Sequence, residues 1–380
     1  MSRFKRLARR ASLILLLLAL PALIGCGRGE PAQPPLSAAA LAAVIEKPGV
    51  SRTKLARAAD ALFTDPTIGE TRALLVMQGG KIVVQRYARP YNAKTRFIGW
   101  SLTKCVTGVL TGLLVADGRL RLDEPAPIRT WQRPGDARGE ITLRQLLQMR
   151  SGLRHREGAD PRYAADAVRM LFLDGRDDMA AYAEAQPLEA EPGAKWEYSS
   201  ATSVILADAA AGALTESRDP ALRRQAVADY LRTRLFEPLG MRSAQPEFDP
   251  AGTMIGGSML HATARDWSRL GEFLRNGGAV VGAQILPRGW TEFMTAPSPR
   301  NQGYGAQVWL NRPQPDGHEV LFPGGAPASM FACIGHLGQY ILVSPSQRLT
   351  VVRLGKTDDE QRDALRRRLA GLVGVFPAVR

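Results

Sequence analysis

Cysteine is scarce in this 380-residue chain, which contains only Cys26, Cys105 and Cys333. Three cysteines are too few for the disulfide framework of a small secreted domain, so the fold must depend on a hydrophobic core. The length and a hydrophobic share of 45% are ample for one large globular domain or two small ones. Whether Cys105 and Cys333 pair is left open by the sequence.

Histidine is also scarce. The sequence contains no internal repeat. The four histidines show no metal-ligand spacing: His155, His261, His318 and His336. Zinc sites require closely spaced His, Cys or carboxylate ligands. We therefore expect no metal site and no other cofactor.

Long apolar runs are absent except at the start of the chain. Leu13 to Ile24 is almost continuously apolar and follows a basic head, the pattern of a secretory signal whose core is too short to span a bilayer. Residues 23–26, Leu-Ile-Gly-Cys, are similar to the bacterial lipobox, in which the cysteine is lipidated and becomes the mature N-terminus. We expect a lipoprotein signal peptide in residues 1–25, with Cys26 carrying a lipid that anchors the protein to the membrane.

A plain signal peptide or an uncleaved anchor remains the alternative at this end of the chain. Residues 27–37 are rich in Gly, Pro and polar residues, so residues 26–40 are expected to form a flexible tether. Residues 41–380 then form the folded domain. The localisation predicted is that of a secreted bacterial lipoprotein on the periplasmic face of the envelope.

Lysine and arginine outnumber the acidic residues, and the formal net charge is +14. The first 25 residues contribute five of these positive charges and no negative one, so subtracting them leaves +9. The arginines are scattered, without a basic stripe or interleaved aromatics. The scattered arginines and the expected export of the protein both argue against nucleic acid as a partner.

Hydrophobic periodicity and turn residues predict strands near both ends of the chain and helices between them. The expected helices are 38–63, 101–116, 221–236, 263–276 and 358–373. The expected strands are 73–77, 82–87, 304–310, 330–334, 339–343 and 349–354. This order predicts an α/β protein of the α+β sandwich type, in which one antiparallel sheet combines N- and C-terminal strands, helices flank it, and a helical lobe is inserted at about 119–299.

The most informative motif is Ser101-Leu102-Thr103-Lys104, which places a hydroxyl and an amine one helical turn apart. A neutral amine within hydrogen-bond reach can take the proton of a serine, which is otherwise a poor nucleophile. The apolar helix that follows would dehydrate Lys104 and favour its neutral form. The alternative is a serine that caps the helix, with a surface lysine. A second copy, Ser51 to Lys54, lies in a polar segment with no apolar helix behind it, and we interpret that copy as chance.

Further segments accompany this motif in a fixed order. They are residues 117–125 (DGRLRLDEP), 141–147 (ITLRQLL), 151–153 (SGL), Pro192-Gly193, 198–200 (YSS), 256–258 (GGS) and 262–266 (ATARD). In this set the chain resembles the penicillin-recognising serine hydrolases, which include class C β-lactamases, DD-peptidases, related esterases and the 6-aminohexanoate-dimer hydrolases. The resemblance covers about residues 60–355. It implies that Ser101 is the nucleophile and Lys104 its base.

The resemblance also implies a role for Tyr198, which faces the nucleophile in the second motif of the family. A phenol beside an ammonium can lose its proton more easily, or can relay a proton to the leaving group. Ser200 ends this motif. Trp100, Trp196 and Tyr304 are expected either to line an apolar substrate pocket or to pack in the core.

The third motif of the family lies on the strand that edges the site, and here His336-Leu337-Gly338 is the candidate. The resemblance implies that the backbone N–H groups of Gln339 and Ser101 form the oxyanion hole. Gly338 would let substrate approach the backbone closely. His336 would hydrogen-bond substrate or the Tyr/Lys network, unless it is simply a solvated histidine at the end of a strand.

Two departures from the family pattern bear on the substrate. The Lys-Thr-Gly triplet that holds the carboxylate of β-lactams is absent, and Ser200 replaces the Asn of class C β-lactamases. The pattern is most similar to the aminohexanoate-dimer hydrolase and esterase branch. We therefore expect a serine hydrolase of small-molecule esters or linear amides that forms an acyl-enzyme on Ser101.

Other functions stay open. A β-lactamase or DD-peptidase would use the same residues and suits an envelope location. A non-catalytic envelope binding protein could keep the fold without the activity. An α/β-hydrolase triad is disfavoured because residues 256–260 lack the second glycine of a nucleophile elbow.

Overall fold

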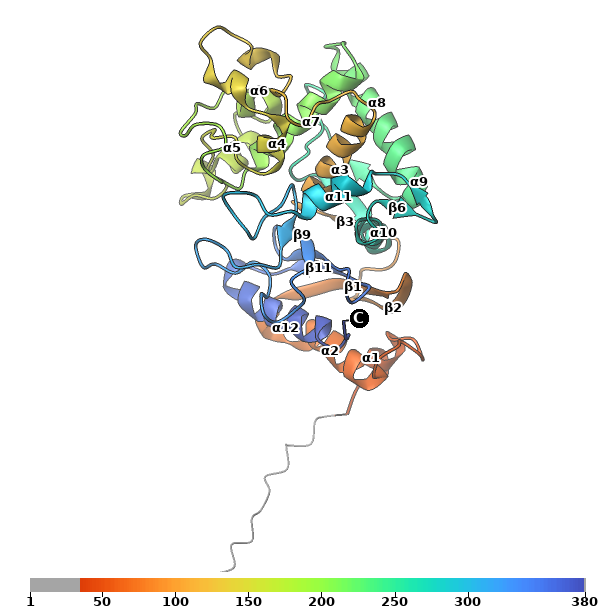
Figure 1. Cartoon of the computed structure of the whole chain (residues 1–380). Coiled ribbons are helices and arrows are strands. Elements are labelled where there is room, and N and C mark those ends of the chain that lie inside the picture. Colours follow the sequence, from red (N-terminus) through yellow and green to blue (C-terminus); the bar gives the residue numbers. More distant parts are fainter. Residues whose placement is uncertain (1–34, 379–380) are drawn as a thin grey trace, which may run out of the picture. The chain divides into compact units, whose positions relative to one another are not determined.

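The computed structural model describes residues 35–378 (Figure 1). The expected signal peptide, Cys26 and most of the expected tether lie outside the described residues. The strands are β1 Glu70–Gln78, β2 Lys81–Tyr87, β3 Arg96–Ile98, β4 Gln245–Pro246, β5 Leu260–Thr263, β6 Ala279–Val280, β7 Ala283–Gln284, β8 Trp309–Leu310, β9 Phe331–Gly335, β10 Gln339–Ser344 and β11 Leu349–Lys356. The helices are α1 Ala38–Ala42, α2 Arg52–Thr64, α3 Leu102–Ala116, α4 Leu143–Leu147, α5 Asp166–Phe172, α6 Met179–Glu184, α7 Ser200–Leu214, α8 Pro220–Leu231, α9 Glu237–Leu239, α10 Ala264–Arg275, α11 Arg288–Thr295 and α12 Arg362–Val373.

The main sheet has six antiparallel strands in the order β2-β1-β11-β10-β9-β8. β1 pairs with β11 from Glu70 opposite Lys356 to Gln78 opposite Leu349, so strands from the two ends of the chain are neighbours. The hairpin of β1 and β2 turns at Gly79-Gly80, both of which have positive φ. These observations confirm the fold class predicted from the sequence.

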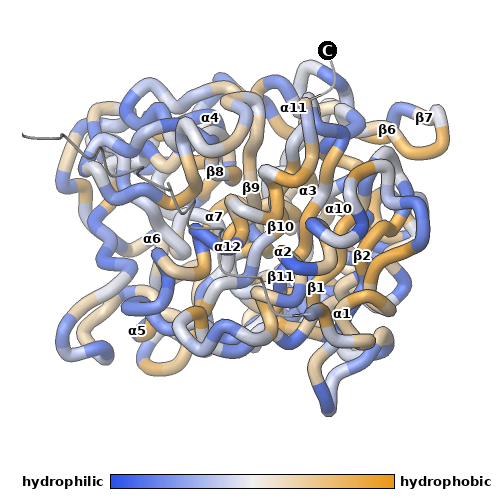
Figure 2. The backbone as a smooth tube through the Cα atoms, turned by 90° about the horizontal axis from the view of Figure 1, so that it is seen from below, coloured by the Kyte–Doolittle hydropathy of each residue, from blue (hydrophilic) through white to orange (hydrophobic). Residues whose placement is uncertain are grey.

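Helices cover both faces of the main sheet (Figure 1). α2 and α12 lie on one face, where Leu74 and Val76 of β1 point, and α10 and α3 lie on the other, where Ala73 and Leu75 point. Strand residues alternate between the two faces, so a strand buried on both sides is apolar throughout. Figure 2 shows this as hydrophobic strands and α3 at the centre, with hydrophilic loops outside.

The inserted region consists mainly of α4 to α9, and α7 packs against α3. A second, three-stranded sheet, β3-β5-β4, joins this region to the main sheet. α10 falls within the expected lobe at 119–299 but packs on β1, β10 and β11, so that lobe is less continuous than the sequence indicated. Within residues 35–378, no helix is long and apolar enough to cross a membrane.

Several element boundaries differ from the prediction. The helix expected at 38–63 is two helices, because residues 43–51 leave the helix, Val44 forms a bridge with Val84, and Gly49 adopts positive φ. The strand expected at 304–310 is reduced to β8, since Gln307 has positive φ and breaks the extended run. The helix expected at 221–236 changes to a π-helical turn at Arg232–Phe236.

Candidate active site

Ser101 stands at the start of α3, immediately after Trp100, whose φ of +47° is unusual for a residue with a side chain. Such strained positions are often found at functional sites. Ser101 is the N-cap of α3, yet its hydroxyl makes no capping hydrogen bond. By contrast, the Ser51 hydroxyl accepts from the Lys54 amide and caps α2, and both residues are exposed. Only the 101–104 copy therefore leaves its serine hydroxyl available for chemistry.

Lys104 is buried, with 2% of its surface exposed, and all its polar contacts are within the site. Its Nζ donates to Ser101 Oγ at 2.9 Å, to Ser200 Oγ at 2.9 Å and to the Gly257 carbonyl oxygen at 2.8 Å. Burial lowers the pKa of Lys104 to about 8, against the opposing effect of the Glu157 charge. The surface lysine considered as an alternative is excluded, and a neutral amine is accessible near physiological pH.

Tyr198 reaches the nucleophile from the segment that precedes α7. The Ser101 hydroxyl hydrogen-bonds to its phenol oxygen, and Lys104 Nζ lies 4.8 Å from the centre of its ring. Burial and the negative charge of Glu157 raise the pKa of Tyr198 above its ordinary value. Of the two roles considered for this phenol, the electrostatics favour a protonated tyrosine that relays a proton.

Aromatic rings hold Tyr198 in place. Trp309 stacks on it with ring centres 5.2 Å apart, and Tyr304 meets it edge-on at 6.0 Å. Tyr304 is only 1% exposed and also contacts Trp196, at 5.6 Å. Tyr304 is therefore a packing residue behind the phenol, whereas Trp100 and Trp196 are partly exposed.

Glu157 is the residue that the sequence interpretation missed. Its carboxylate accepts from the Ser200 hydroxyl at 2.6 Å and from the Ser200 amide at 2.8 Å, and it lies 2.7 Å from His155 Nε2. Burial opposes its ionisation, but the hydrogen bond with His155 and the charge of Lys104 prevail and hold the pKa of Glu157 at about 2. Ser200 thus links a permanent negative charge to the amine of Lys104.

No sequence pattern pairs Glu157 with Ser200, because 43 residues separate them. The available signal was position: Glu157 follows Ser151-Gly152-Leu153, a segment already identified as part of the motif set. An acidic residue in a polar loop is otherwise read as solvated. Its side chain is 33% exposed here, although both carboxylate oxygens are hydrogen-bonded within the site.

The Gly256-Gly257-Ser258 segment forms a wall of the site between α3 and α7. A Cβ on Gly256 would lie 2.7 Å from the Ser203 carbonyl oxygen, and one on Gly257 would lie 2.8 Å from that of Ser200. Only glycine permits the backbone to approach α7 this closely. The close approach brings the Gly257 carbonyl oxygen to the Lys104 amine. The segment therefore supplies a backbone acceptor and no nucleophile elbow.

His336-Leu337-Gly338 lies in the turn between β9 and β10, not on the edge strand where the sequence placed it. His336 is exposed, and its ring meets Trp100 edge-on at 5.5 Å. A Cβ on Gly335 would lie 2.2 Å from the Gly99 carbonyl oxygen, so the end of β9 passes directly beside the start of α3. The turn therefore does adjoin Ser101.

Gly338 does not have the role expected for it. The space beside its Cα is filled by Arg353, Leu365 and Thr357, so this glycine faces the protein interior and offers no approach to substrate. Its positive φ of +77° is the reason that the turn needs glycine here.

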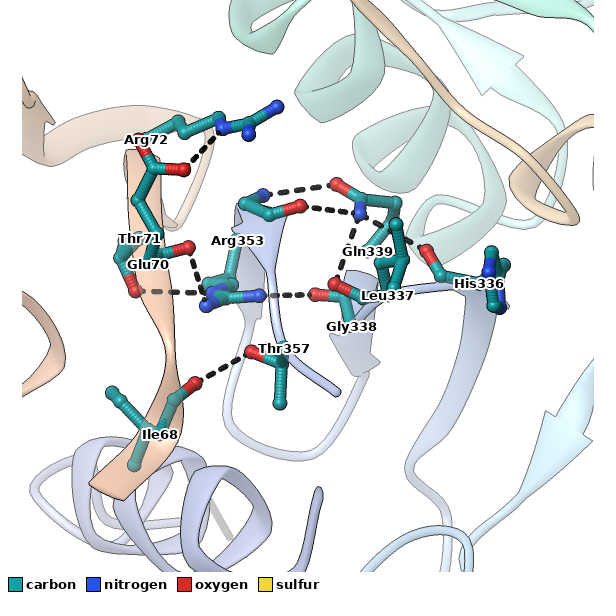
Figure 3. Close-up of polar contacts among 11 residues, drawn as sticks. Ile68, Glu70, Thr71, Arg72, His336, Leu337, Gly338, Gln339, Arg353 and Thr357 are labelled. Atoms are coloured by element: carbon teal, nitrogen blue, oxygen red, sulfur yellow. Dashed lines mark hydrogen bonds and ion pairs between the residues drawn. The ribbon is translucent and has the colours of Figure 1, made fainter. Parts of the chain in front are cut away.

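The expectation for Gln339 also requires correction. Gln339 is 3% exposed, and its side-chain amide donates to the carbonyl oxygens of His336 and Leu337 and to that of Gly355, as Figure 3 shows. Its backbone is part of the β9–β10 ladder opposite Gly335. In contrast, the N–H groups of Ser101 and His336 have no hydrogen-bond acceptor among residues 35–378. The Ser101 amide, at the start of α3, is therefore free to donate to an oxyanion.

A disulfide between Cys105 and Cys333 joins α3 to β9, with the two Cα atoms 6.1 Å apart. The question that the sequence left open is thereby answered. The bond links the helix that begins at Ser101 to the strand that leads to His336. Among the described residues, no group of three or more His, Cys, Asp or Glu side chains could hold a metal ion.

The comparison with protein families agrees with this geometry. The model of the family described as Beta-lactamase matches residues 66–375. This chain belongs to the beta-lactamase family. Membership confirms the resemblance drawn from the motifs, and the curated relatives of this beta-lactamase-family hydrolase include a 6-aminohexanoate-dimer hydrolase and an esterase.

Three proteins illustrate what this chain is similar to. The 6-aminohexanoate-dimer hydrolase of Paenarthrobacter ureafaciens is 24% identical over 307 residues, which are 76% of this chain and 73% of that protein. Esterase EstB of Burkholderia gladioli is 32% identical over 222 residues, 51% of this chain and 53% of the esterase. A penicillin-binding protein homologue from Caulobacter crescentus is 18% identical with a TM-score of 0.60, covering 85% of this chain and 96% of that one, and shows the shared fold.

Proposed function

We propose that this beta-lactamase-family protein hydrolyses small esters or linear amides through an acyl-enzyme on Ser101. The observation that carries the proposal is the convergence of two groups on one hydroxyl: Lys104 Nζ at 2.9 Å and the hydrogen-bonded phenol of Tyr198. A nucleophile, a base and a proton relay in mutual hydrogen-bond reach are the requirements of acyl transfer.

Lys104 acts as the base in its neutral form. An uncharged amine keeps two N–H groups, one for Ser200 Oγ and one for the Gly257 carbonyl, and directs its lone pair at Ser101. It accepts the Ser101 proton as Oγ bonds to the substrate carbonyl carbon, and the carbonyl π electrons move to the oxygen. The N–H group of Ser101 would receive that oxyanion, and such a donor is typically worth about 3 kcal/mol.

Tyr198 completes the proton path. When the tetrahedral species collapses, the C=O bond re-forms and the alcohol or amine leaves with a proton from the Tyr198 phenol, which regains one from the Lys104 ammonium. Water then attacks the acyl-enzyme by the same route, giving up its proton to Lys104 and releasing the acid. The raised pKa of Tyr198 keeps the phenol protonated for this step.

Two observations favour esters and linear amides over β-lactams. The strand that edges the site, β9, has the sequence Phe-Ala-Cys-Ile-Gly and supplies no cation for a β-lactam carboxylate. The relatives named above include a 6-aminohexanoate-dimer hydrolase and an esterase. A β-lactamase or DD-peptidase is the second candidate, supported by the shared fold of the penicillin-binding protein homologue.

A substrate panel tests the proposal. Purified protein should hydrolyse p-nitrophenyl acetate and butyrate, and short linear amides more slowly, with kcat/KM for the esters far above that for a chromogenic cephalosporin. A cephalosporin turned over as fast as the esters would favour the second candidate. Absence of turnover and of fluorophosphonate labelling would reject a hydrolase altogether.

The charge of Glu157 should influence the pH at which kcat/KM rises. Since the base must be neutral, kcat/KM should rise with pH through an apparent pKa of about 8, the pKa of Lys104. Glu157 raises that pKa, so Glu157→Gln should move the rising limb to lower pH. The check is kcat/KM against pH, each profile normalised to its own plateau.

Glu189→Gln is the matched control, because this carboxylate is exposed and pairs with Lys195 on the surface. Its profile should overlay that of the unmodified protein. If the rising limb of the Glu157→Gln profile stays at the same pH or moves to higher pH, Glu157 does not act on the base.

A further inference from the structure

His155 is buried beside the site but takes no part in the proton path of Lys104 and Tyr198. Its side chain is 2% exposed, and its Nε2 lies 2.7 Å from Oε2 of Glu157. The pKa of Glu157, about 2, keeps that carboxylate ionised. An ionised carboxylate can only accept hydrogen bonds, so Nε2 of His155 carries the hydrogen and donates it.

The backbone on both sides of His155 is fixed by the inserted region. The Arg154 N–H donates to the Pro187 carbonyl oxygen at 2.8 Å. The Arg156 N–H donates to Oδ2 of Asp166 at 2.8 Å, and the Asp166 N–H donates back to the Arg156 carbonyl oxygen at 2.8 Å. Asp166 is buried at the start of α5. The imidazole is therefore attached to a well-anchored loop.

The Glu157 carboxylate depends on its hydrogen bonds to stay in place, because its side chain is 33% exposed and protein does not enclose it on every side. The Ser200 hydroxyl donates to Oε1, and the Ser200 N–H and His155 Nε2 both reach Oε2. Two of these three donors belong to one residue, Ser200, and His155 supplies the third from a different segment. Without the imidazole, the carboxylate can rotate toward solvent.

The direction of the Ser200 hydroxyl decides where the base points. Its single hydrogen goes to Glu157 at 2.6 Å, so its oxygen accepts from Lys104 Nζ at 2.9 Å. The Gly257 carbonyl oxygen accepts from the same nitrogen at 2.8 Å. A neutral amine has two N–H groups and one lone pair, and these two acceptors use both N–H groups. The lone pair is then left for Ser101 Oγ, at 2.9 Å.

The opposite direction of this hydroxyl would prevent Lys104 from acting as the base. If Glu157 turned away, the Ser200 hydroxyl could donate to the lone pair of the amine. Lys104 would then direct an N–H at Ser101 and could not accept its proton. Serine proteases show how large such an error can be, since replacing the carboxylate that orients their catalytic histidine lowers kcat by about 10⁴-fold.

We propose that His155 is a positioning residue that holds the Glu157 carboxylate against Ser200. In that position the Ser200 hydroxyl points away from Lys104, whose lone pair is directed at Ser101. The proposal rests on the hydrolase function proposed above. His155 touches no substrate and acts only through Glu157.

Two substitutions of His155 test this role. His155→Leu removes the donor, whereas His155→Gln places an amide N–H near the position of Nε2. In His155→Leu, kcat for p-nitrophenyl butyrate should fall about 10- to 100-fold, less than for a fully misdirected base, because both contacts from Ser200 remain. KM should stay within about twofold, since no contact with substrate is lost. His155→Gln should recover most of the lost rate.

The pH profile distinguishes this role from a general loss of stability. Among the described residues, Glu157 and the phenol of Tyr198 are the titratable groups that face Lys104, and it is Glu157 that raises the pKa of the amine. A carboxylate that turns toward solvent raises that pKa less. The rising limb of kcat/KM should therefore move to lower pH in His155→Leu and return toward its original pH in His155→Gln.

A double variant tests whether His155 acts through Glu157. If it does, His155→Leu combined with Glu157→Gln should be as fast as Glu157→Gln alone, within about twofold. Losses that multiply would show that His155 acts by another route, and the proposal would be wrong.

His261→Leu is the matched control. Nε2 of His261 also lies 2.7 Å from a glutamate, at Oε1 of the exposed Glu247. This variant removes the same kind of contact away from the base, so kcat and the pH profile should match those of the unmodified protein.

The outcomes separate the two proposals. If the unmodified protein turns over no ester, the hydrolase function fails and the positioning role fails with it. If the unmodified protein is active but His155→Leu keeps both its kcat and its rising limb, the positioning role is wrong and the hydrolase function stands. The same holds if His155→Gln is as slow as His155→Leu. Should His155→Leu not fold, His155→Phe, which keeps a ring without the donor, replaces it in each comparison.

Discussion

Replacing Ser101 with alanine should lower kcat/KM for p-nitrophenyl butyrate by about 10⁴- to 10⁶-fold, as loss of the nucleophile does in other serine hydrolases. Only the hydroxyl group is removed; it makes no capping bond to α3, and its hydrogen bonds are to Lys104 and Tyr198 within the site, so the fold has little reason to change. The measurement is initial rates of ester hydrolysis, with circular dichroism to confirm folding.

Ser51→Ala is the control that the chain itself provides. Ser51 begins the second Ser-x-x-Lys sequence and caps α2 with its hydroxyl. Its loss should cost about 1 kcal/mol of stability and leave kcat/KM unchanged. Comparable activity loss in both alanine variants would show that the effect is general and that Ser101 is not the nucleophile.

Replacing Lys104 with methionine should lower kcat/KM by about 10³-fold, within the range expected for loss of a general base. Methionine fills the buried space and cannot accept the Ser101 proton. The rising limb with an apparent pKa of about 8 should disappear as well, since its titrating group is gone. Both effects are read from kcat/KM measured across pH.

Lys54→Met supplies the matching control on α2, where the lysine is exposed. It should show an unaltered rate and an unaltered pH profile. If Lys104→Met keeps its activity, or keeps the limb near pH 8, another group must activate Ser101, and Lys104 would be only a buried structural cation.

The sequence was sufficient for the architecture because the relevant signals are local. The Gly79-Gly80 turn between two β-rich runs predicted the first hairpin, and the apolar run after Ser101 predicted the buried helix α3. Strands at both ends of the chain predicted one shared sheet, whereas the pairing of β1 with β11 is seen only in the structure. The break at 43–51 was missed because alanine-rich flanks favour helix, while the bridge of Val44 to Val84 is a long-range contact.

The candidate site likewise combines residues that could be predicted from the sequence with residues that could not. Ser101 and Lys104 are three residues apart, so the helix alone brings them together, and Tyr198 came from the family pattern. Glu157 could not be paired with Ser200 from sequence, because only packing within the inserted region brings the Glu157 loop to the start of α7. Gln339 was assigned to the oxyanion hole by motif position. Its buried amide instead holds the turn, and which amides are left unpaired emerges only from the three-dimensional hydrogen bonding.

The most direct test is to locate the covalent adduct that a fluorophosphonate forms on the unmodified protein, by intact mass and peptide mapping. The account predicts a single adduct on Ser101, formed quickly above pH 8 and slowly when Lys104 is methionine. An adduct on another serine, or a Ser101 adduct that forms as fast without Lys104, would contradict it.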